Sequence, residues 1–428
     1  MSVREIGPRP VTRNMVTELS GTIRVALARP MADFYLVLAS ATALIALGLY
    51  MVVSASSVLS MVATGNPYTY GFSQLRIAAI GIPVVFVLSR MSRRLLTALA
   101  WAGVTLAIVL LTLVIIPGGP GVDVGGNQAW LKLGPLPQFE PSEFAKVALV
   151  LWSAALFAQP ARANRLEKAG ALLLPYLPVS ALILGLVVAE RDMGTAVIIG
   201  AIIIAQLWFV GAPSRLLGVL IAGGGVGMAL GVVFSAVRRA KVVDFLATMF
   251  PFLHLPNTLS SDQPQNAIYA LATGGWWGVG PGASRQKWGG LYNGAHTDYI
   301  LAVLGEELGL FGILVVLALL VTLLVTGLRI ARRSDSMFWR MAVSGLVGWF
   351  FVQASINTLV AFGMLPVMGV PFPLVSFGGS ALMAAMIAIG VMLAAARHEP
   401  SARRALAERR AEGHPHRMAG VVVARRTK

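Results

Sequence analysis

Long apolar stretches separated by short polar connections dominate the chain. A membrane-spanning helix needs about 20 mostly apolar residues. Ten stretches approach that length: 34–54, 75–88, 95–116, 143–157, 170–189, 193–210, 216–237, 298–326, 341–362 and 374–396. Several are short for a full span, and 143–157 is the weakest because it begins with charged residues. The pattern predicts an all-α polytopic membrane protein with ten transmembrane helices.

Basic residues occupy alternate connections between these stretches. They gather in the N-terminal segment 1–33, in the connections around 90–94, 162–168 and 329–340, and in the tail 397–428. In a ten-helix arrangement all five segments lie on one side, and the positive-inside rule makes that side cytoplasmic. We therefore expect both termini in the cytoplasm and three parts: a basic segment (1–33), a ten-helix membrane domain (34–396) and a basic tail (397–428).

The composition agrees with a membrane protein and excludes several other classes. The 428 residues are 57% hydrophobic and 12% charged, and their mean hydropathy is +0.77. Soluble proteins carry about 25% charged residues. The formal net charge of +16 follows from the basic cytoplasmic segments, so no nucleic-acid partner is expected. The absence of cysteine excludes disulfides, thiolate metal sites and a thiol nucleophile.

Two predicted outer loops are long, 117–142 and 238–297, and the second connects the seventh and eighth helices. Loops of this length are usually functional. The second loop is rich in glycine and tryptophan, and it carries the basic residues Arg238, Arg239, Lys241, Arg285 and Lys287. These cations are candidates for binding a phosphate or pyrophosphate, although ordinary solvation of a loop explains them equally well.

Ionisable residues at or near membrane depth are candidates for function because burying them is costly. Glu143 and Lys146 are spaced i, i+3 at a helix start and would form either a structural ion pair or part of a cavity lining. Asp192 follows a polar turn and would either cap a helix or serve the site.

Asp298 is the strongest candidate for catalysis. It follows His296 and Thr297 at the predicted start of the eighth helix and closes the larger outer loop, and Glu306 and Glu307 follow it. It would be either a helix cap or a carboxylate base that takes a proton from a sugar hydroxyl. At least one of the two glutamates should face the protein interior. The five histidines form no zinc signature.

Four stretches of the chain resemble the SEDS family (shape, elongation, division and sporulation), whose members include FtsW, RodA and SpoVE. The resemblance spans about 34–396, and together the stretches are highly specific in this order. They are Asn127, Trp130-Leu131, Gly134-Pro135 and Phe139 to Lys146; Asp192-Met193-Gly194-Thr195; Gly274 to Lys287 with His296-Thr297-Asp298-Tyr299 and Gly305 to Gly309; and Asn357, Gly363, Leu365-Pro366, Gly369-Val370-Pro371, Pro373 and Ser376 to Ser380.

The resemblance implies a peptidoglycan glycosyltransferase that polymerises lipid II at the outer face of the cytoplasmic membrane. Asp298 matches the family's essential aspartate and would act as general base, with inversion at the reacting carbon. The implied substrate-contacting residues are Trp130, Glu143, Lys146, Asp192, Arg239, Lys241, Gln286, Lys287, His296, Thr297 and Ser376. A divalent cation, magnesium or manganese, would help to neutralise the pyrophosphate; the sequence does not identify its ligands.

The resemblance also implies partners and a location. Family members work with a class B penicillin-binding protein transpeptidase, other divisome proteins and membrane lipid. The serine run 54–57 and the extended basic termini are more similar to FtsW than to RodA, which predicts the division septum.

Some positions depart from the family pattern. The chain has Glu140 where glutamine is frequent, and Lys241 where arginine is usual. The alternatives to a division polymerase are a RodA-type elongation polymerase, a lipid II flippase or transporter, and a scaffold without chemistry.

Overall fold

The computed structural model describes residues 29–124, 127–135, 137–159, 169–250, 252, 263–292 and 294–412. A helix lies at each of the ten predicted stretches. Their bounds are α2 (Ala32–Thr64), α3 (Thr69–Leu88), α4 (Arg93–Ile115), α5 (Pro141–Phe157), α7 (Ala169–Ala189), α8 (Met193–Val210), α9 (Ser214–Val233), α12 (Ile300–Arg333), α13 (Met337–Ala361) and α14 (Gly379–Arg397). The parts 1–28 and 413–428 of the predicted basic termini lie outside the described residues.

Eight of these helices, counted over the described residues, are long and apolar enough to cross a membrane. The two others are α5, which has 17 residues and carries Glu143 and Lys146, and α7. The backbone of α7 is non-helical at Leu174, and its apolar part is the shorter segment Leu174–Ala189. The chain is therefore a mostly helical protein with several candidate membrane spans.

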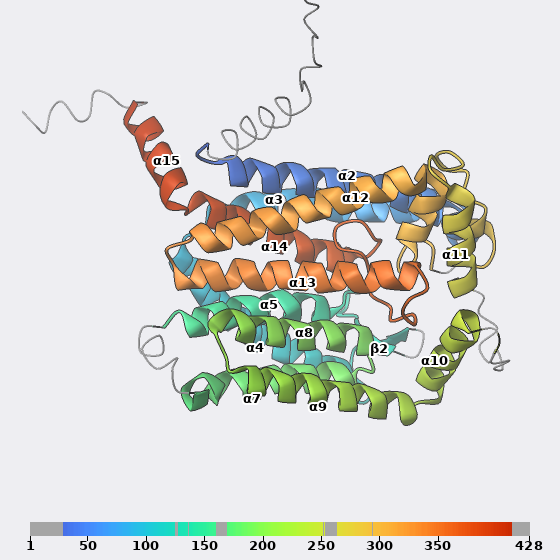
Figure 1. Ribbon diagram of the computed structural model, residues 1–428, viewed down its shortest axis with the longest axis horizontal. Coiled ribbons are helices and arrows are strands. Elements are labelled where there is room, and N and C mark those ends of the chain that lie inside the picture. Colours follow the sequence, from blue (N-terminus) through green and yellow to red (C-terminus); the bar gives the residue numbers. More distant parts are fainter. Residues whose placement is uncertain are drawn as a thin grey trace, which may run out of the picture.

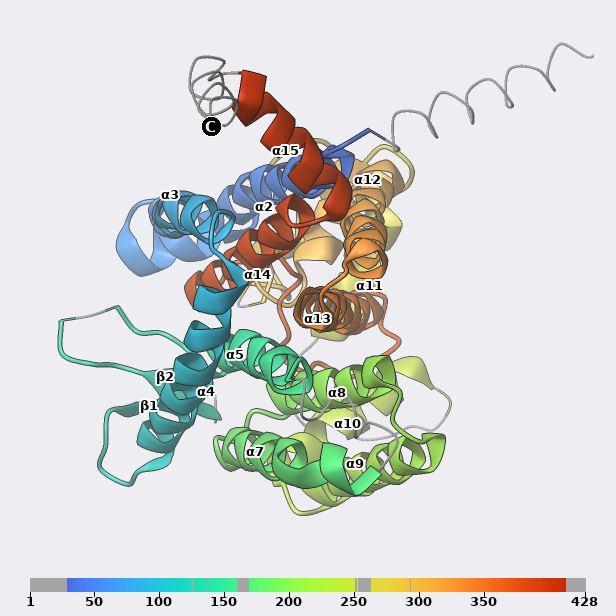
Figure 2. The same ribbon diagram turned by 90° about the vertical axis from the view of Figure 1, so that its left-hand side faces the viewer.

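The helices lie side by side with a distinct set of elements at each end (Figure 1). The start of α2 and the short helix α15 (Pro400–Glu412) lie at one end, whereas β2 (Asn127–Leu131), α10 (Ala236–Met249) and α11 (Gln263–Gly274) lie at the other. Figure 2 shows α7, α8 and α9 grouped on the side away from α2, α12 and α14. α13 and α14 are the most enclosed spans, with 67% and 78% of their apolar windows buried, whereas α9 has only 6%.

The two long loops contain secondary structure that the apolar pattern did not predict. In the first loop β1 (Gly121–Val124) pairs with β2 in an antiparallel arrangement, with Val122 opposite Trp130. The prediction of an all-α fold is therefore wrong at this hairpin. The second loop contains α10, α11 and the 3-10 turn η2 (Gln286–Trp288). The predicted seventh helix 216–237 ends earlier, at Val233, and Ser235 caps α10 by accepting from the Arg238 N–H at 3.5 Å.

A break in α12 at Gly309 joins the second loop to this span. Gly309 has φ 69° and ψ −170°, a backbone conformation that favours glycine. A Cβ atom here would lie 2.4 Å from the Trp276 carbonyl oxygen, so the loop backbone packs directly against the break. The Leu310 N–H donates to the Gly275 carbonyl at 2.9 Å, and the Val279 N–H donates to the Glu306 carbonyl at 2.9 Å. The loop segment 274–280 is therefore hydrogen-bonded to α12 on both sides of the break.

Candidate active site

Asp298 lies in the tight turn 294–299 that precedes α12. The helix begins at Ile300 with Tyr299 as its N-cap and without a side-chain cap hydrogen bond, so the interpretation of Asp298 as a helix cap is wrong. Its side chain is half-buried. No other described residue hydrogen-bonds to its carboxylate, whereas its main-chain carbonyl accepts from Asn357 Nδ2 at 2.9 Å. The backbone of the turn is therefore held in place, whereas the Asp298 carboxylate accepts no hydrogen bond from the described residues.

Three consecutive carbonyls fix this turn. The His296 carbonyl accepts from the Phe377 N–H at 2.8 Å, and the Thr297 carbonyl accepts from Ser376 Oγ at 2.7 Å. Asn357 binds the third, that of Asp298. Ser376 Oγ also accepts from the Phe372 N–H at 2.8 Å. The hydroxyl of Ser376 is therefore engaged in holding the turn.

The surroundings of Asp298 and His296 shift their protonation in opposite directions. Burial raises the pKa of Asp298 to about 6; nearby Lys241 opposes this rise and Asp192 adds to it. Burial lowers the pKa of His296 to about 4; its ring contacts Tyr70 and Phe377. At neutral pH the imidazole is thus neutral and the carboxylate is mostly ionised. A carboxylate with a pKa just below the operating pH is suited to general-base chemistry.

Glu143 and Lys146 form the predicted ion pair. Lys146 Nζ lies 2.7 Å from Glu143 Oε1, and both side chains are buried. Lys146 also donates to Gln353 Oε1 at 3.2 Å. The second glutamate oxygen, Oε2, is buried and has no hydrogen-bond partner among the described residues. The two side chains therefore form a close buried ion pair, and Glu143 Oε2 remains available to accept a further hydrogen bond.

Asp192 is a helix cap, as one of its two interpretations predicted: its Oδ1 accepts from the Thr195 N–H at 3.0 Å. The turn before it is unusual. Arg191 has φ 66°. Glu190 is fully buried, and in the described part of the chain neither of its carboxylate oxygens has a hydrogen-bond partner. Burial, together with the charge of Asp192, raises the pKa of Glu190 to about 9. Burial and the charges of Glu143 and Asp192 also raise the pKa of Glu140 well above its ordinary value.

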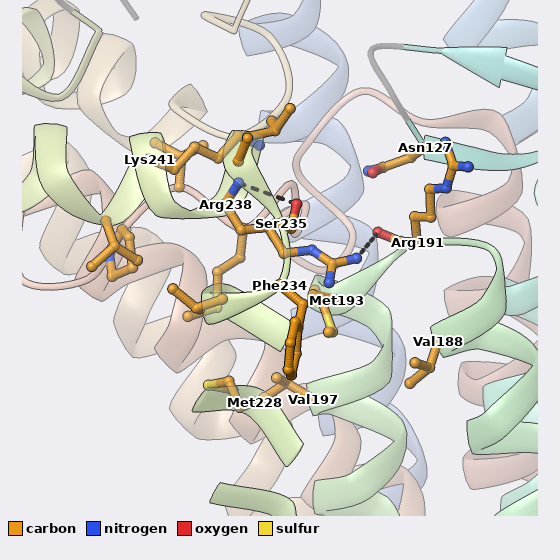
Figure 3. Close-up of a pocket in the computed structure, with 18 residues that line it drawn as sticks. Asn127, Val188, Arg191, Met193, Val197, Met228, Phe234, Ser235, Arg238 and Lys241 are labelled. Atoms are coloured by element: carbon orange, nitrogen blue, oxygen red, sulfur yellow. Dashed lines mark hydrogen bonds between the residues drawn. The ribbon is translucent and has the colours of Figure 1, made fainter. Parts of the chain in front are cut away.

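A cavity of about 700 Å³ opens between the α7–α8 turn and the α9–α10 elbow. Figure 3 shows Arg191, Arg238 and Lys241 around its polar part. Its apolar part is lined by side chains that include Val188, Val197, Met228 and Phe234. We call this cavity the cationic groove. Its combination of cations and apolar surface suits an anionic head group attached to a hydrocarbon chain.

Arg238 ties the two walls of the cationic groove together. Its Nη1 donates to the Gly231 carbonyl at 3.1 Å, and its Nη2 donates to the Arg191 carbonyl at 3.3 Å. Lys241 lines the groove and acts on the pKa of Asp298, so the groove and the carboxylate are neighbours. Arg239 instead donates to the Val233 carbonyl at 2.7 Å.

Other predicted site residues hold the second loop in place. Lys287 is buried and pairs with Glu307 at 3.0 Å; Ser54 Oγ also donates to Glu307, at 2.6 Å. Gln286 contributes its N–H to Glu306 Oε2 at 3.4 Å. Both glutamates are fully buried, although only one was required to be. Trp130 is half-buried in β2. In the same strand, the Gln128 N–H donates to the Glu190 carbonyl.

The apolar pattern gave no role to Gln353 and Asn357 on α13, although both contact the site. The available signal was two amides spaced i, i+4 within an otherwise apolar span, because polar residues at membrane depth are seldom incidental.

A protein-only metal site is not formed by the described residues. They contain no group of three or more His, Cys, Asp or Glu side chains that could hold a metal ion. Magnesium commonly binds through one or two carboxylates together with substrate phosphates. Among the described residues, the expected magnesium or manganese ion therefore has no ready protein cage.

The chain is similar to several known proteins. The family model FtsW/RodA/SpoVE, described as cell cycle protein, matches residues 34–401. A relative from Mycobacterium tuberculosis, named probable peptidoglycan glycosyltransferase FtsW, is 37% identical over 385 residues, which cover 89% of this chain and 71% of the relative. A relative of the same name from Trichlorobacter lovleyi is 33% identical, covering 85% and 93%.

Two solved structures are also similar. One is a chain from a peptidoglycan synthase complex that coordinates polymerization and crosslinking, with a TM-score of 0.67 and 27% identity over 87% of this chain and 98% of that chain. The other is the rod shape determining protein RodA of Thermus thermophilus, with a TM-score of 0.60 and 25% identity over 87% and 98%.

Proposed function

The chain belongs to the FtsW/RodA/SpoVE family of cell cycle proteins, and from that premise we propose that it is an inverting peptidoglycan glycosyltransferase. It polymerises lipid II into glycan strands at the outer face of the cytoplasmic membrane. One observation carries the assignment of its base. Asp298 offers a half-buried carboxylate without a hydrogen bond from the described residues, with a pKa of about 6, next to the cationic groove.

In the proposed reaction Asp298 removes the proton from the 4-hydroxyl of one disaccharide. The resulting oxygen attacks C1 of the muramyl sugar of a second lipid II molecule. The bond between C1 and the pyrophosphate oxygen breaks, undecaprenyl pyrophosphate leaves, and the configuration at C1 inverts. The fixed backbone of residues 296–298 keeps the base in place, and such positioning contributes strongly to the rate.

The cationic groove supplies the electrostatic part of the proposal. Arg191, Arg238 and Lys241 are placed to neutralise a pyrophosphate, and the apolar lining accommodates the first part of a polyprenyl chain. Asp192, His296 and Thr297 lie close to the base and belong to the same proposed substrate site. A magnesium or manganese ion, if bound with the substrate, would add charge neutralisation at the leaving group.

We place both termini in the cytoplasm and assign ten membrane spans, including α5 and α7. A class B penicillin-binding protein is the proposed partner, because a similar solved chain comes from a peptidoglycan synthase complex. The FtsW names of the relatives support a role with other divisome proteins at the division septum. Septal localisation of a fluorescent fusion would support this role, and lateral-wall localisation would favour a RodA-type function.

The direct test is a lipid II polymerisation assay with purified protein, with and without the cognate transpeptidase. Wild type should form polymer, and Asp298→Asn should form none while its thermal unfolding stays normal. Polymer from the variant at the wild-type rate would overturn the assignment of the base. Translocation of lipid II in vesicles without polymer would favour a transporter, and neither activity with any partner would favour a scaffold.

A further inference from the structure

Gln353 and Asn357 occupy one face of α13, one helical turn apart. Both are buried, with 2% and 1% of their surfaces exposed. Residues spaced i, i+4 on a helix are neighbours, so the two amides form a short ladder. Buried amides require hydrogen-bond partners. The partners of this ladder are unusual because they include both the turn that carries Asp298 and the Glu143–Lys146 pair.

Asn357 links Asp298 to the loop that follows α13. Its Nδ2 atom donates to the Asp298 carbonyl at 2.9 Å and to the Val370 carbonyl at 2.7 Å. Its Oδ1 atom is buried, and no described residue donates a hydrogen bond to it. Both donor hydrogens are therefore used on main-chain carbonyls of two segments that lie far apart in the sequence.

Gln353 repeats this arrangement one turn away. Its Nε2 donates to the carbonyl of Pro371, the residue after Val370, at 2.8 Å. Its Oε1 accepts from Lys146 Nζ at 3.2 Å and from Trp349 Nε1 at 2.5 Å. The consecutive carbonyls 370 and 371 thus form the bridge between the two amides, and each amide also contacts one part of the site.

We infer that Gln353 and Asn357 are positioning residues that fix the Asp298 base relative to the Glu143–Lys146 pair. The inference rests on the proposed function and deepens it. Neither amide contacts the carboxylate of Asp298. They act through the backbone, so their loss should loosen the base without removing it, and a misplacement near 1 Å costs about 100-fold in rate.

The test uses three variants that conserve side-chain volume in the full-length protein: Asn357→Leu, Gln353→Met and the control Gln206→Met. Gln206 is a fully buried amide on α8, and its Nε2 donates to the Met341 carbonyl at 3.5 Å. It is therefore matched in burial and chemistry but bonded elsewhere. Lipid II polymerisation is measured as kcat and KM from pH 5 to pH 9, beside thermal unfolding.

We expect Asn357→Leu to lower kcat by about 30- to 100-fold and Gln353→Met by about 10-fold, with KM changed less than about threefold. A loosened Asp298 becomes better hydrated, so the acid limb of kcat/KM should move to lower pH in Asn357→Leu. The control should lose thermal stability to a similar degree while its kcat stays within threefold. Gln353→Met should likewise lower kcat with little change in KM. It therefore tests the positioning role by itself if Asn357→Leu does not fold.

Wild-type kcat and an unmoved acid limb in the site variants would overturn the inference, as would an equal fall in the control. Asp298→Asn, assayed in parallel, separates this failure from that of the proposed function. If Asp298→Asn is inactive and the amide variants are normal, only the positioning inference falls. Full activity of Asp298→Asn would remove the base and the inference together.

Discussion

The described part of the chain contains two buried lysine–glutamate pairs, and their surroundings differ. Lys287 and Glu307 lie 3.0 Å apart; Lys287 also donates to the Gly282 carbonyl at 2.7 Å, and Ser54 Oγ donates to Glu307 at 2.6 Å. In the second pair, Glu143 keeps a buried oxygen without a partner. The first pair is fully bonded and joins a loop to a helix, whereas the second retains an acceptor and contacts the ladder that leads to Asp298.

The difference teaches that burial and pairing alone do not separate a structural ion pair from a functional one. Both pairs satisfy the rule that buried charges are paired. What separates them is the remaining hydrogen-bonding capacity of the carboxylate and the identity of the neighbours. We expect the fully bonded pair to serve stability and the open pair to serve activity, and variants at each pair test that division.

The largest effect is expected from Lys287→Met, which leaves Glu307 as an uncompensated buried charge. Breaking a buried pair in this way costs about 3–5 kcal/mol, and the loop 274–289 should become sensitive to protease. Thermal unfolding in detergent measures the first effect and limited proteolysis the second. The double variant Lys287→Met/Glu307→Gln is the control and should recover most of the lost stability. Normal stability of the single variant would contradict the structural role.

The next effect concerns the open pair. The double variant Glu143→Gln/Lys146→Met removes both charges, so its stability should change little, because neutral replacements of a buried pair are often tolerated. Its polymerisation rate should fall by about 100-fold, the loss typical for one preorganised polar contact in an active site. The matched double variant at Lys287 and Glu307 should lose much less activity. Equal losses at both pairs would erase the proposed division.

A smaller effect is expected from Lys241→Met. Lys241 lowers the pKa of Asp298, which burial raises to about 6. Removing this positive charge should raise that pKa further, so the base becomes protonated at a higher pH. The acid limb of kcat should therefore move upward, and the rate at pH 6 should fall by a few fold more than the rate at pH 8. Arg239→Met serves as the control, because the Arg239 side chain donates to the Val233 carbonyl instead; an equal shift there would count against the explanation.

The smallest effect extends the comparison to Glu190, a buried carboxyl that forms no ion pair with the described residues. Its pKa is raised to about 9 in the folded protein from an ordinary value of 4.5. The unfolded chain therefore ionises first, and the folded protein loses stability as pH rises from about 4.5 towards 9. Glu190→Gln removes this loss, so its unfolding temperature should exceed that of wild type by a few degrees at pH 8 and match it near pH 4.5. If Glu190→Gln unfolds at a lower temperature than wild type at pH 8, the ionised Glu190 carboxylate stabilises the folded protein and the explanation is wrong.

The apolar pattern predicted the helices well because hydrocarbon requires internally bonded helices. Each predicted stretch became a helix, with ends that differ by several residues, as at Val233. The hairpin β1–β2 was missed because four- and five-residue strands give little signal beside long apolar runs. α10 was partly assigned to the seventh helix, because Ser235 is the one polar residue that interrupts the apolar pattern 216–237 before Arg238.

The candidate active site was predicted residue by residue and not as a geometry. Local spacing gave the ion pair of Glu143 with Lys146 and the cap at Asp192 as one of two interpretations each, and the structure contains both contacts. The partners of Lys287 were not predictable, because Ser54 lies far from it in the sequence. The sequence marked Asn357 only as part of a family-like stretch, because its bond to the Asp298 carbonyl depends on how α13 meets the turn before α12.

The break at Gly309 also decides how the site relates to the thickness of the bilayer. The part of α12 after the break, 310–333, rises about 36 Å at 1.5 Å per residue, which exceeds a hydrocarbon core of about 30 Å. That part alone can span the membrane. The segment 300–308 before the break, held against the tryptophan-rich loop, then need not match the hydrocarbon core. We therefore expect a thinner or thicker membrane to tilt the later part of α12 and to leave Asp298 in place.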